Sequence, residues 1–169
     1  YSLSGIIRRL AHNVSEHVQE TLIETYAAHY LNPNNHNMTL FPEALSCLQR
    51  LQQQGYWLAI ATGKGRSGLD KAIAQTDTQA FWLETACASE YPSKPAPDMV
   101  LALCDRLGVE PEEAVVVGDT THDLEMAANA KIRAIAVATG AHTAQQLSSM
   151  PHVAILNSLA ELPDVLETL

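Results

Sequence analysis

Apolar residues follow two different periods along this chain, one typical of helices and one typical of buried strands. Near the beginning, five apolar residues recur at spacings of three and four: Leu3, Ile6, Ile7, Leu10 and Val14. This spacing predicts an amphipathic helix, and a second helix is expected after the capping residue Ser15, so that residues 1–31 are helical. The polar stretch NPNNHNMT, residues 32–39, predicts a linker after these helices.

Beyond the linker, helical segments alternate with short apolar runs. The runs predicted to form strands are WLAIAT (57–62), ETACAS (84–89), AVVVG (114–118), RAIAVA (133–138) and VAIL (153–156). The segments predicted to form helices are 42–55, 67–75, 95–107, 122–130 and 159–168. A continuous apolar run such as 57–62 indicates a strand that is buried on both faces. The alternation predicts an α/β fold, in which helices cover both faces of a parallel sheet.

Composition and charge exclude several classes of partner. Ten basic and nineteen acidic residues give a net charge of −9, which argues against nonspecific binding to nucleic acid or to anionic membranes. A small phosphorylated ligand held by local groups remains compatible with that charge. Apolar runs such as AIAVA are too short to span a bilayer, and no signal-peptide pattern is visible. Three widely spaced cysteines without a C-x-x-C pair predict buried, reduced thiols in a cytoplasmic protein: Cys47, Cys87 and Cys104.

The segment AVVVGDTTHDLEMAANA, residues 114–130, carries two carboxylates at the junction of a predicted strand and helix. Asp119 directly follows the strand, and Asp123 lies in the first turn of the helix. Magnesium prefers oxygen ligands and keeps several waters, so these two carboxylates could form half of a metal site. The competing interpretation is a capping box, in which Thr120 and Asp123 stabilise the start of the helix. His122 between the carboxylates is expected to face solvent.

Two further polar clusters follow predicted strands, where open parallel sheets bind their ligands. Thr62 and Gly63 offer a hydroxyl and a backbone N–H group to a phosphate oxygen, although a turn explains the same residues. Lys64 is expected to point to solvent. Lys94 precedes a proline and is expected in a loop above the sheet, where its ammonium could neutralise a phosphate. A solvated surface lysine is the simpler alternative.

Taken in this order, Thr-Gly after one strand, then Lys-Pro, then G-D-T-x-x-D after another strand resemble motifs two, three and four of the haloacid dehalogenase superfamily, closest to its phosphoglycolate-phosphatase-like branch. The resemblance implies a Rossmann-like three-layer α/β/α core with a small helical cap, divided here into residues 1–37 and 38–169. It implies a magnesium-dependent hydrolase of a small phosphate monoester that works through an aspartyl-phosphate. In that role, Thr62 and Gly63 bind phosphate with Lys94, and Asp119 and Asp123 bind magnesium, with Asp123 acting through water or by fixing Lys94.

The family's first motif, D-x-D-G-T, supplies the nucleophilic aspartate, and no D-x-D occurs in this sequence. The chain begins with Tyr1, and the resemblance implies that it starts inside the cap, after the first-motif strand. In the family that strand lies between the strands predicted at 57–62 and 114–118. The chain by itself is therefore expected to lack phosphatase activity and to leave two unpaired sheet edges facing a gap.

Two alternatives belong to other functional classes. A phosphoacceptor signalling domain would need its acidic pair early and its lysine late, which is the reverse of the order here. A noncatalytic protein that binds a phosphate or a partner would fit a chain without the first motif. The sequence leaves the substrate and the oligomeric state open. Finally, the family usually has glycine at the position of Lys131, where a lysine in the left-handed conformation costs about 1 kcal/mol unless the turn differs.

Overall fold

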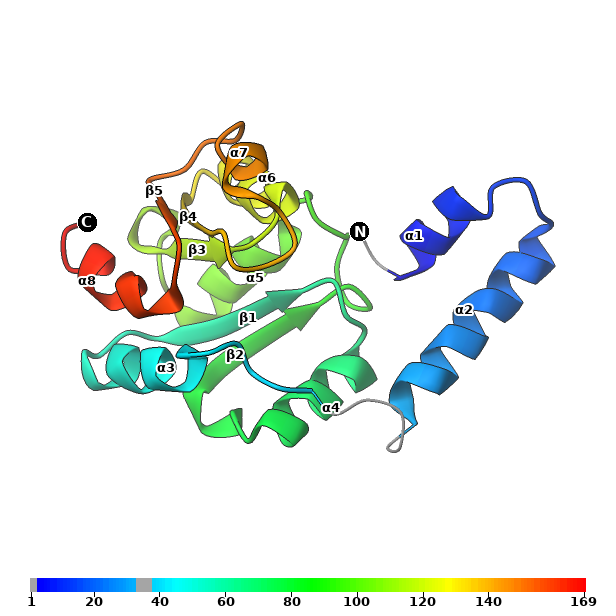
Figure 1. The fold of residues 1–169 in the computed structure, drawn as a ribbon, viewed down its shortest axis with the longest axis horizontal. Helices are drawn as coiled ribbons and strands as arrows, with labels where there is room; N and C mark the ends of the chain where they lie inside the picture. Colours follow the sequence, from blue (N-terminus) through cyan, green and yellow to red (C-terminus); the bar gives the residue numbers. More distant parts are fainter. Residues whose placement is uncertain (1–2, 33–37) are drawn as a thin grey trace.

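The computed structural model describes residues 3–32 and 38–169, and it contains five strands in two parallel sheets (Figure 1). Strands β1 (Leu58–Thr62) and β2 (Trp82–Cys87) form the first sheet. The second sheet has the order β3-β4-β5. Its strands are β3 (Val115–Gly118), β4 (Arg133–Val137) and β5 (Ala154–Leu156). The predicted α/β class with parallel strands is confirmed. The division into two sheets agrees with the gap that was expected between the strands at 57–62 and 114–118.

Helices occur before, between and after the strands, mostly at the predicted places. They are α1 (Leu3–Leu10), α2 (Glu16–Leu31), α3 (Ala44–Gln53), α4 (Arg66–Thr76), α5 (Asp98–Leu107), α6 (Thr121–Asn129), α7 (Ala144–Leu147) and α8 (Leu162–Leu166). The short helix α7 was not predicted, because one turn is too brief to show a period. None of the described helices is long and apolar enough to cross a membrane. Part of the predicted linker, residues 33–37, lies outside the described residues.

Helix α5 begins three residues later than the sequence predicted. Pro95 was expected to start it, but the first helical residue is Asp98. The reason is Pro97, because the residue before a proline is disfavoured in the helical conformation and Ala96 therefore cannot extend the helix backward. The predicted stop at Gly108 is confirmed, since this glycine has a φ of 65° and caps the helix in the left-handed conformation.

Strand β4 lies at the centre of the core and is buried on both faces. Ala134 and Ala136 pack into one apolar cluster with residues of α5 and α6, while Ile135 packs into a second cluster with α3, β5 and α8. This alternation follows from the two-residue period of a strand. Helices therefore cover both faces of the second sheet, as predicted.

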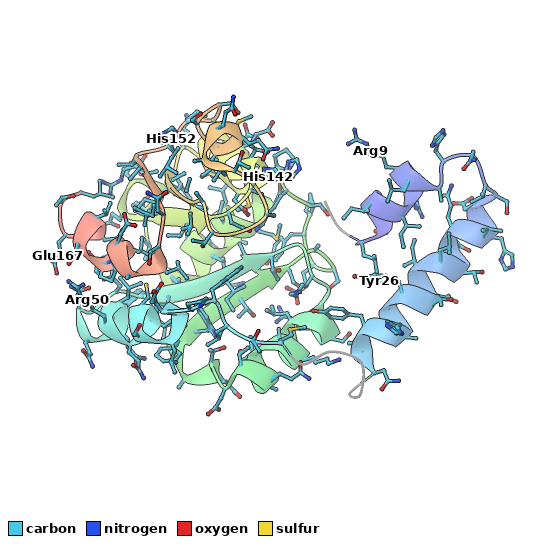
Figure 2. The ribbon with its side chains drawn as sticks, viewed as in Figure 1. Arg9, Tyr26, Arg50, His142, His152 and Glu167 are labelled. Carbon is cyan, nitrogen blue, oxygen red and sulfur yellow. The ribbon has the colours of Figure 1, made fainter. Side chains whose placement is uncertain are left out.

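A polar contact fastens α8, near the chain's C-terminal end, to α3. Arg50 on α3 pairs with Asp164 on α8, and its guanidinium lies 3.9 Å from the Glu167 carboxylate (Figure 2). The hydrogen bond with Asp164 raises the pKa of the Arg50 guanidinium. These side chains are exposed, so the pair contributes little to stability compared with the apolar cluster that α3 and α8 share.

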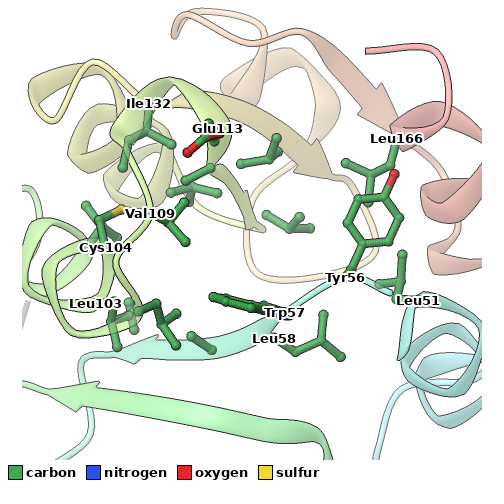
Figure 3. Close-up of a pocket in the computed structure, with 18 of the residues that line it drawn as sticks. Leu51, Tyr56, Trp57, Leu58, Leu103, Cys104, Val109, Glu113, Ile132 and Leu166 are labelled. Carbon is green, nitrogen blue, oxygen red and sulfur yellow. The ribbon is translucent and has the colours of Figure 1, made fainter. Parts of the chain in front are cut away.

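Strands β1 and β3 face each other across a cavity of about 500 Å³ (Figure 3). The structure shows no pairing between these two strands. Trp57, just before β1, is 63% exposed and projects into this space. The run 57–62 was expected to be buried on both faces, but Trp57 is exposed and residues 58–62 are only half-buried, because one edge of β1 borders the cavity. We call this space the inter-sheet cavity.

Helices α1 and α2 pack against each other beside the core, and α2 contacts α4 (Figure 1). The apolar stripe predicted on the first helix exists but is not buried, since Leu10 is 77% exposed and Ile6 is also exposed. Ser15 occupies the N-cap position of α2, as predicted, without a side-chain hydrogen bond.

The turn after α6 yields a first prediction. Lys131 has a φ of 60° and an exposed side chain, so the expected left-handed conformation is confirmed. Replacing Lys131 by glycine should raise the free energy of unfolding by roughly 1 kcal/mol, because glycine adopts this conformation without the Cβ clash. Urea denaturation measures the change. Lys131→Ala is the matched control and should gain little, since it keeps the Cβ atom; an equal gain from both variants would contradict the backbone explanation.

Candidate functional site

The predicted polar residues follow strands β1, β2 and β3 in the folded chain. Thr62 is the last residue of β1, Lys94 lies in the loop between β2 and α5, and Asp119 directly follows β3. Lys94 and Asp123 both line the inter-sheet cavity, together with Ala61 of β1. The structure therefore brings Lys94 and Asp123 together at this cavity, whereas Thr62, Gly63 and Asp119 are not among the residues that line it.

Lys94 and Asp123 form a largely buried ion pair. The Lys94 ammonium donates to Asp123 Oδ1 at 2.5 Å, and the two side chains are 15% and 10% exposed. Burial by itself would raise the pKa of the Asp123 carboxyl, but the Lys94 charge and the hydrogen bonds from Lys94 and Thr120 outweigh it and hold this pKa below its usual range. Lys94 is thus fixed in position and is not a solvated surface lysine.

The second oxygen of Asp123 closes the capping box that the sequence predicted. Thr120 donates to Asp123 Oδ2 from its backbone N–H at 3.1 Å and from its hydroxyl at 2.6 Å. In return, the Asp123 N–H donates to the Thr120 hydroxyl at 3.3 Å. Both oxygens of Asp123 are therefore engaged, one by Lys94 and one by Thr120, so capping the helix and holding the lysine are compatible roles for one carboxylate.

A glycine allows this carboxylate to lie against the end of β3. A Cβ atom built on Gly118 would meet Asp123 Cβ at 2.2 Å, far inside van der Waals contact. Any other residue at position 118 would push Asp123 away from Lys94.

Asp119 is held by the loop that follows β4. Its Oδ2 accepts a hydrogen bond from the Ala141 N–H at 2.8 Å, and its backbone carbonyl accepts one from the His142 N–H at 3.1 Å. A Cβ atom on Gly140 would lie 2.0 Å from the same Oδ2. One sequence signal marks this loop, the glycine in ATGAHT, and Gly140, Ala141 and His142 were not predicted as site residues.

The loop after β1 is anchored to the loop after β2. The Ala88 N–H donates to the Lys64 carbonyl at 3.0 Å, and the Arg66 N–H donates to the Ser89 hydroxyl at 3.1 Å. The Arg66 guanidinium also donates twice to the Glu90 carboxylate, each time at 2.8 Å. The hydrogen bond from Arg66 holds the pKa of Glu90 below its usual value. These bonds keep the loop that carries Gly63 against the segment that leads to Lys94.

His122 was expected to face solvent but is placed differently, whereas the expected exposure of Lys64 is confirmed. His122 is half-buried, its ring centroid lies 6.2 Å from that of His142, and burial lowers its pKa. The Lys64 ammonium donates to the Tyr30 hydroxyl of α2 at 2.8 Å, although the side chain is exposed. Sequence reasoning missed both contacts because each joins segments that are separated along the chain.

The carboxylate oxygens of Asp119 and Asp123 differ in whether they are available to bind magnesium. Asp119 offers one carboxylate oxygen that accepts no hydrogen bond from any described residue, whereas Asp123 has both oxygens engaged. Within residues 3–32 and 38–169, no three His, Cys, Asp or Glu side chains cluster as metal ligands. Magnesium can bind through one or two carboxylates and several waters. Asp119 therefore fits a magnesium site, as one member of a larger ligand set.

The buried pair gives the second prediction. Asp123→Asn leaves the Lys94 ammonium without its partner and should lower the free energy of unfolding at about pH 7 by about 3 kcal/mol. Since the folded-state pKa of Asp123 lies below its unfolded value, the contribution of the carboxylate is present above about pH 4 and is lost as the pH falls through the folded-state pKa.

As the pH falls, the free energies of unfolding of wild type and Asp123→Asn should therefore approach each other. Urea denaturation of these two proteins from about pH 7 down to about pH 3 measures the difference. Asp70→Asn is the control, because Asp70 pairs with Arg66 at 3.5 Å on the surface with 61% of its side chain exposed. It should change stability by less than about 0.5 kcal/mol. A constant difference between wild type and Asp123→Asn across the pH range would contradict the assignment of an ionised, buried Asp123.

Comparison with known proteins identifies relatives of this chain. The sequence model of the haloacid dehalogenase-like hydrolase family matches residues 1–137. A protein of Dickeya dadantii named "Probable phosphatase IndB" is 34% identical over 125 residues, covering 73% of this chain and 54% of the relative. The phosphoglycolate phosphatase of Vibrio vulnificus strain YJ016 is 26% identical over 127 residues, covering 75% of this chain and 56% of the relative. The matched region thus spans about half the length of these relatives.

Solved structures have the same fold. A haloacid dehalogenase-like family hydrolase from Streptococcus pneumoniae superposes with a TM-score of 0.81 at 19% identity, covering 95% of this chain and 75% of that one. The match over residues 1–137 agrees with the resemblance carried by Thr62, Lys94 and Asp119, and this chain belongs to the haloacid dehalogenase-like hydrolase family.

Proposed function

We propose that this chain forms part of a magnesium-dependent phosphatase that hydrolyses a small phosphate monoester through an aspartyl-phosphate. The observation that carries the proposal is the buried Lys94–Asp123 pair beside Asp119, at the carboxyl ends of the strands. A fixed ammonium next to carboxylates suits phosphoryl transfer, in which positioning and electrostatic stabilisation supply most of the catalysis. The names of the relatives, which include phosphatases, support the same reaction class.

Each site residue takes a distinct role in this proposal. The Thr62 hydroxyl and the Gly63 N–H hold phosphate oxygens. Lys94 offsets the phosphate charge and orients the nucleophile, while Asp123 keeps Lys94 in place through its 2.5 Å contact. Asp119 ligates magnesium through the oxygen that Ala141 leaves open. Magnesium, when bound, would neutralise charge on the phosphoryl group during transfer.

The nucleophile requires a further segment. The sequence contains no D-x-D motif, and the inter-sheet cavity lies between β1 and β3, where the family's first-motif strand would run. We assign this cavity to such a strand, whose carboxyl end would place an aspartate beside Thr62, Lys94 and Asp119. The apolar lining from Ala59, Val116 and their neighbours suits a strand that is buried on both faces.

The proposed phosphatase has two domains and a cytoplasmic location. Residues 1–37 would form part of a cap and residues 38–169 the core, and the protein would act in the cytoplasm.

The alternative is a noncatalytic protein that binds a phosphate or a partner, and the missing D-x-D motif favours it. Enzymatic assay separates the two, because a binding protein would hydrolyse no phosphate ester even when the first-motif strand is supplied.

The third prediction tests the metal assignment in a protein that carries the first-motif segment ahead of these residues. Asp119→Asn should weaken magnesium binding and lower kcat by about 100-fold or more, because it removes a direct ligand. Asp123→Asn should weaken magnesium binding less, since it acts through Lys94. Magnesium titrations of aryl phosphate hydrolysis give both values. An unchanged magnesium dependence in Asp119→Asn would refute the metal assignment.

The fourth prediction concerns residues 1–169 without any added segment. This chain should hydrolyse no aryl phosphate at any magnesium concentration, because it holds no nucleophilic aspartate in the cavity. It should also be poorly stable or fill the cavity with another chain, since unpaired strand edges invite pairing. Intact mass spectrometry excludes a retained peptide, and size-exclusion chromatography detects self-association. Hydrolysis by the monomeric chain, at the rate of the protein with the first motif, would overturn the assignment of the nucleophile.

A further inference from the structure

A second cavity, also of about 500 Å³, lies between the helical pair α1–α2 and the loops after β1 and β2. We call it the cap-side cavity. Gly63, which binds phosphate in the proposed function, is one of its lining residues. The cap-side cavity therefore adjoins the proposed phosphate site. Tyr26 projects from α2 toward the rest of the molecule on this side (Figure 2). If the proposed function holds, this cavity receives the part of the substrate that leaves when phosphate is transferred.

The electrostatic character of the cap-side cavity is set by one residue. Among the described residues that line it, Lys64 is the one charged side chain, and no carboxylate lines the cavity. The Lys64 ammonium donates to the Tyr30 hydroxyl at 2.8 Å and lies 5.1 Å from the centroid of the same ring. Tyrosine is neutral at pH 7, so this partner does not offset the ammonium charge. The cavity therefore favours an anionic group over a neutral or cationic one.

The shape and lining favour an apolar body of ring size. The helical side contributes Ile6, Ile23 and Tyr26, whereas the core side presents small residues, among them Ser67 and Ala88. A volume of about 500 Å³ falls in the range of small-molecule sites and is far more than a two-carbon group needs.

Tyr30 is positioned for recognition by contacts outside the cavity. Gly68 lets its ring approach α4 closely, since an added Cβ atom would lie 3.3 Å from Tyr30 Cε1. The Lys71 ammonium donates to the backbone carbonyls of Tyr30 at 2.5 Å and of Asn32 at 3.0 Å, at the end of α2. Lys71 does not line the cavity, so it holds Tyr30 without facing the proposed ligand.

We infer that Lys64 and Tyr30 determine substrate specificity, and that the substrate is a phosphate monoester whose leaving group has an apolar, ring-sized body with a carboxylate or similar anion. The anion would accept a hydrogen bond from the Lys64 ammonium. It would accept a second from the Tyr30 hydroxyl, which donates to Met38 Sδ at 3.7 Å and would turn from that weak acceptor to the anion, while α1 and α2 cover the body.

The test compares phenyl phosphate with 4-carboxyphenyl phosphate, in the protein that carries the first-motif segment. Wild type should show a kcat/KM at least about 10-fold higher for the carboxylated ester, mainly through KM. Lys64→Met should lower the ratio of the two kcat/KM values by about 10-fold, and Tyr30→Phe by a smaller factor. Lys64→Arg should retain most of the preference. Lys131→Met is the matched control and should leave the ratio unchanged, because Lys131 is exposed, follows α6 and does not line the cavity.

The outcomes separate this inference from the proposed function. Failure of wild type to hydrolyse either ester would refute the proposed function, and the inference with it. Hydrolysis of both esters with the same ratio in wild type and Lys64→Met would overturn the inference alone. Thermal unfolding of each variant confirms that it is folded, and Tyr30→Phe gives an independent reading if Lys64→Met is unstable.

Discussion

The buried ion pair between Lys94 and Asp123 is the interaction on which the arrangement of the site depends. It connects the loop after β2, in the first sheet, to the helix after β3, in the second. Burying two charges is costly, and their attraction offsets that cost only in close contact with the remaining oxygens satisfied. Both conditions hold, because the ammonium lies at 2.5 Å and Thr120 occupies the other carboxylate oxygen.

Two glycines make the close contacts of the carboxylates possible. Gly118 leaves room for Asp123 against β3, and Gly140 leaves room for Asp119 beneath the loop after β4. Neither glycine is required by a positive φ, since the constraint is the space that a Cβ atom would occupy. The two carboxylates are thus held differently: Asp123 by side-chain partners, and Asp119 by backbone groups that leave one of its oxygens available.

The inter-sheet cavity lies between two strand edges, those of β1 and β3, that do not pair with each other. Parallel strands normally have neighbours on both edges when they are buried, whereas β1 and β3 border an apolar space of about 500 Å³. Lys94 and Asp123 line its end, so a segment that entered it would meet the polar cluster directly. In the proposed function, a strand that filled this cavity would pair with β1 and β3 and complete the active site at the same time.

Local patterns predicted much of the fold and the order of the site residues. Apolar periodicity located the helices and strands, since burial requires one face of each element to be apolar. Gly108 marked the end of α5, and its positive φ confirms that prediction. The sequence also placed Thr62, Lys94 and Asp119 after strands. The start of α5 was wrong because the effect of Pro97 on its neighbour outweighed the signal of Pro95.

The tertiary structure decided what depends on contacts between distant segments. The sequence left Asp123 open between a cap and a functional carboxylate, and its pairing with Lys94, 29 residues away, showed that it has both sets of contacts. In the same way, His122 was expected in solvent but is half-buried beside the His142 ring, and the exposed Lys64 donates to the Tyr30 hydroxyl, a partner that the sequence did not predict. The sequence by itself determined the elements and their order, because these follow from neighbouring residues. The partners of each polar side chain followed only from packing, because hydrogen bonds and ion pairs form between whichever groups the fold brings within reach.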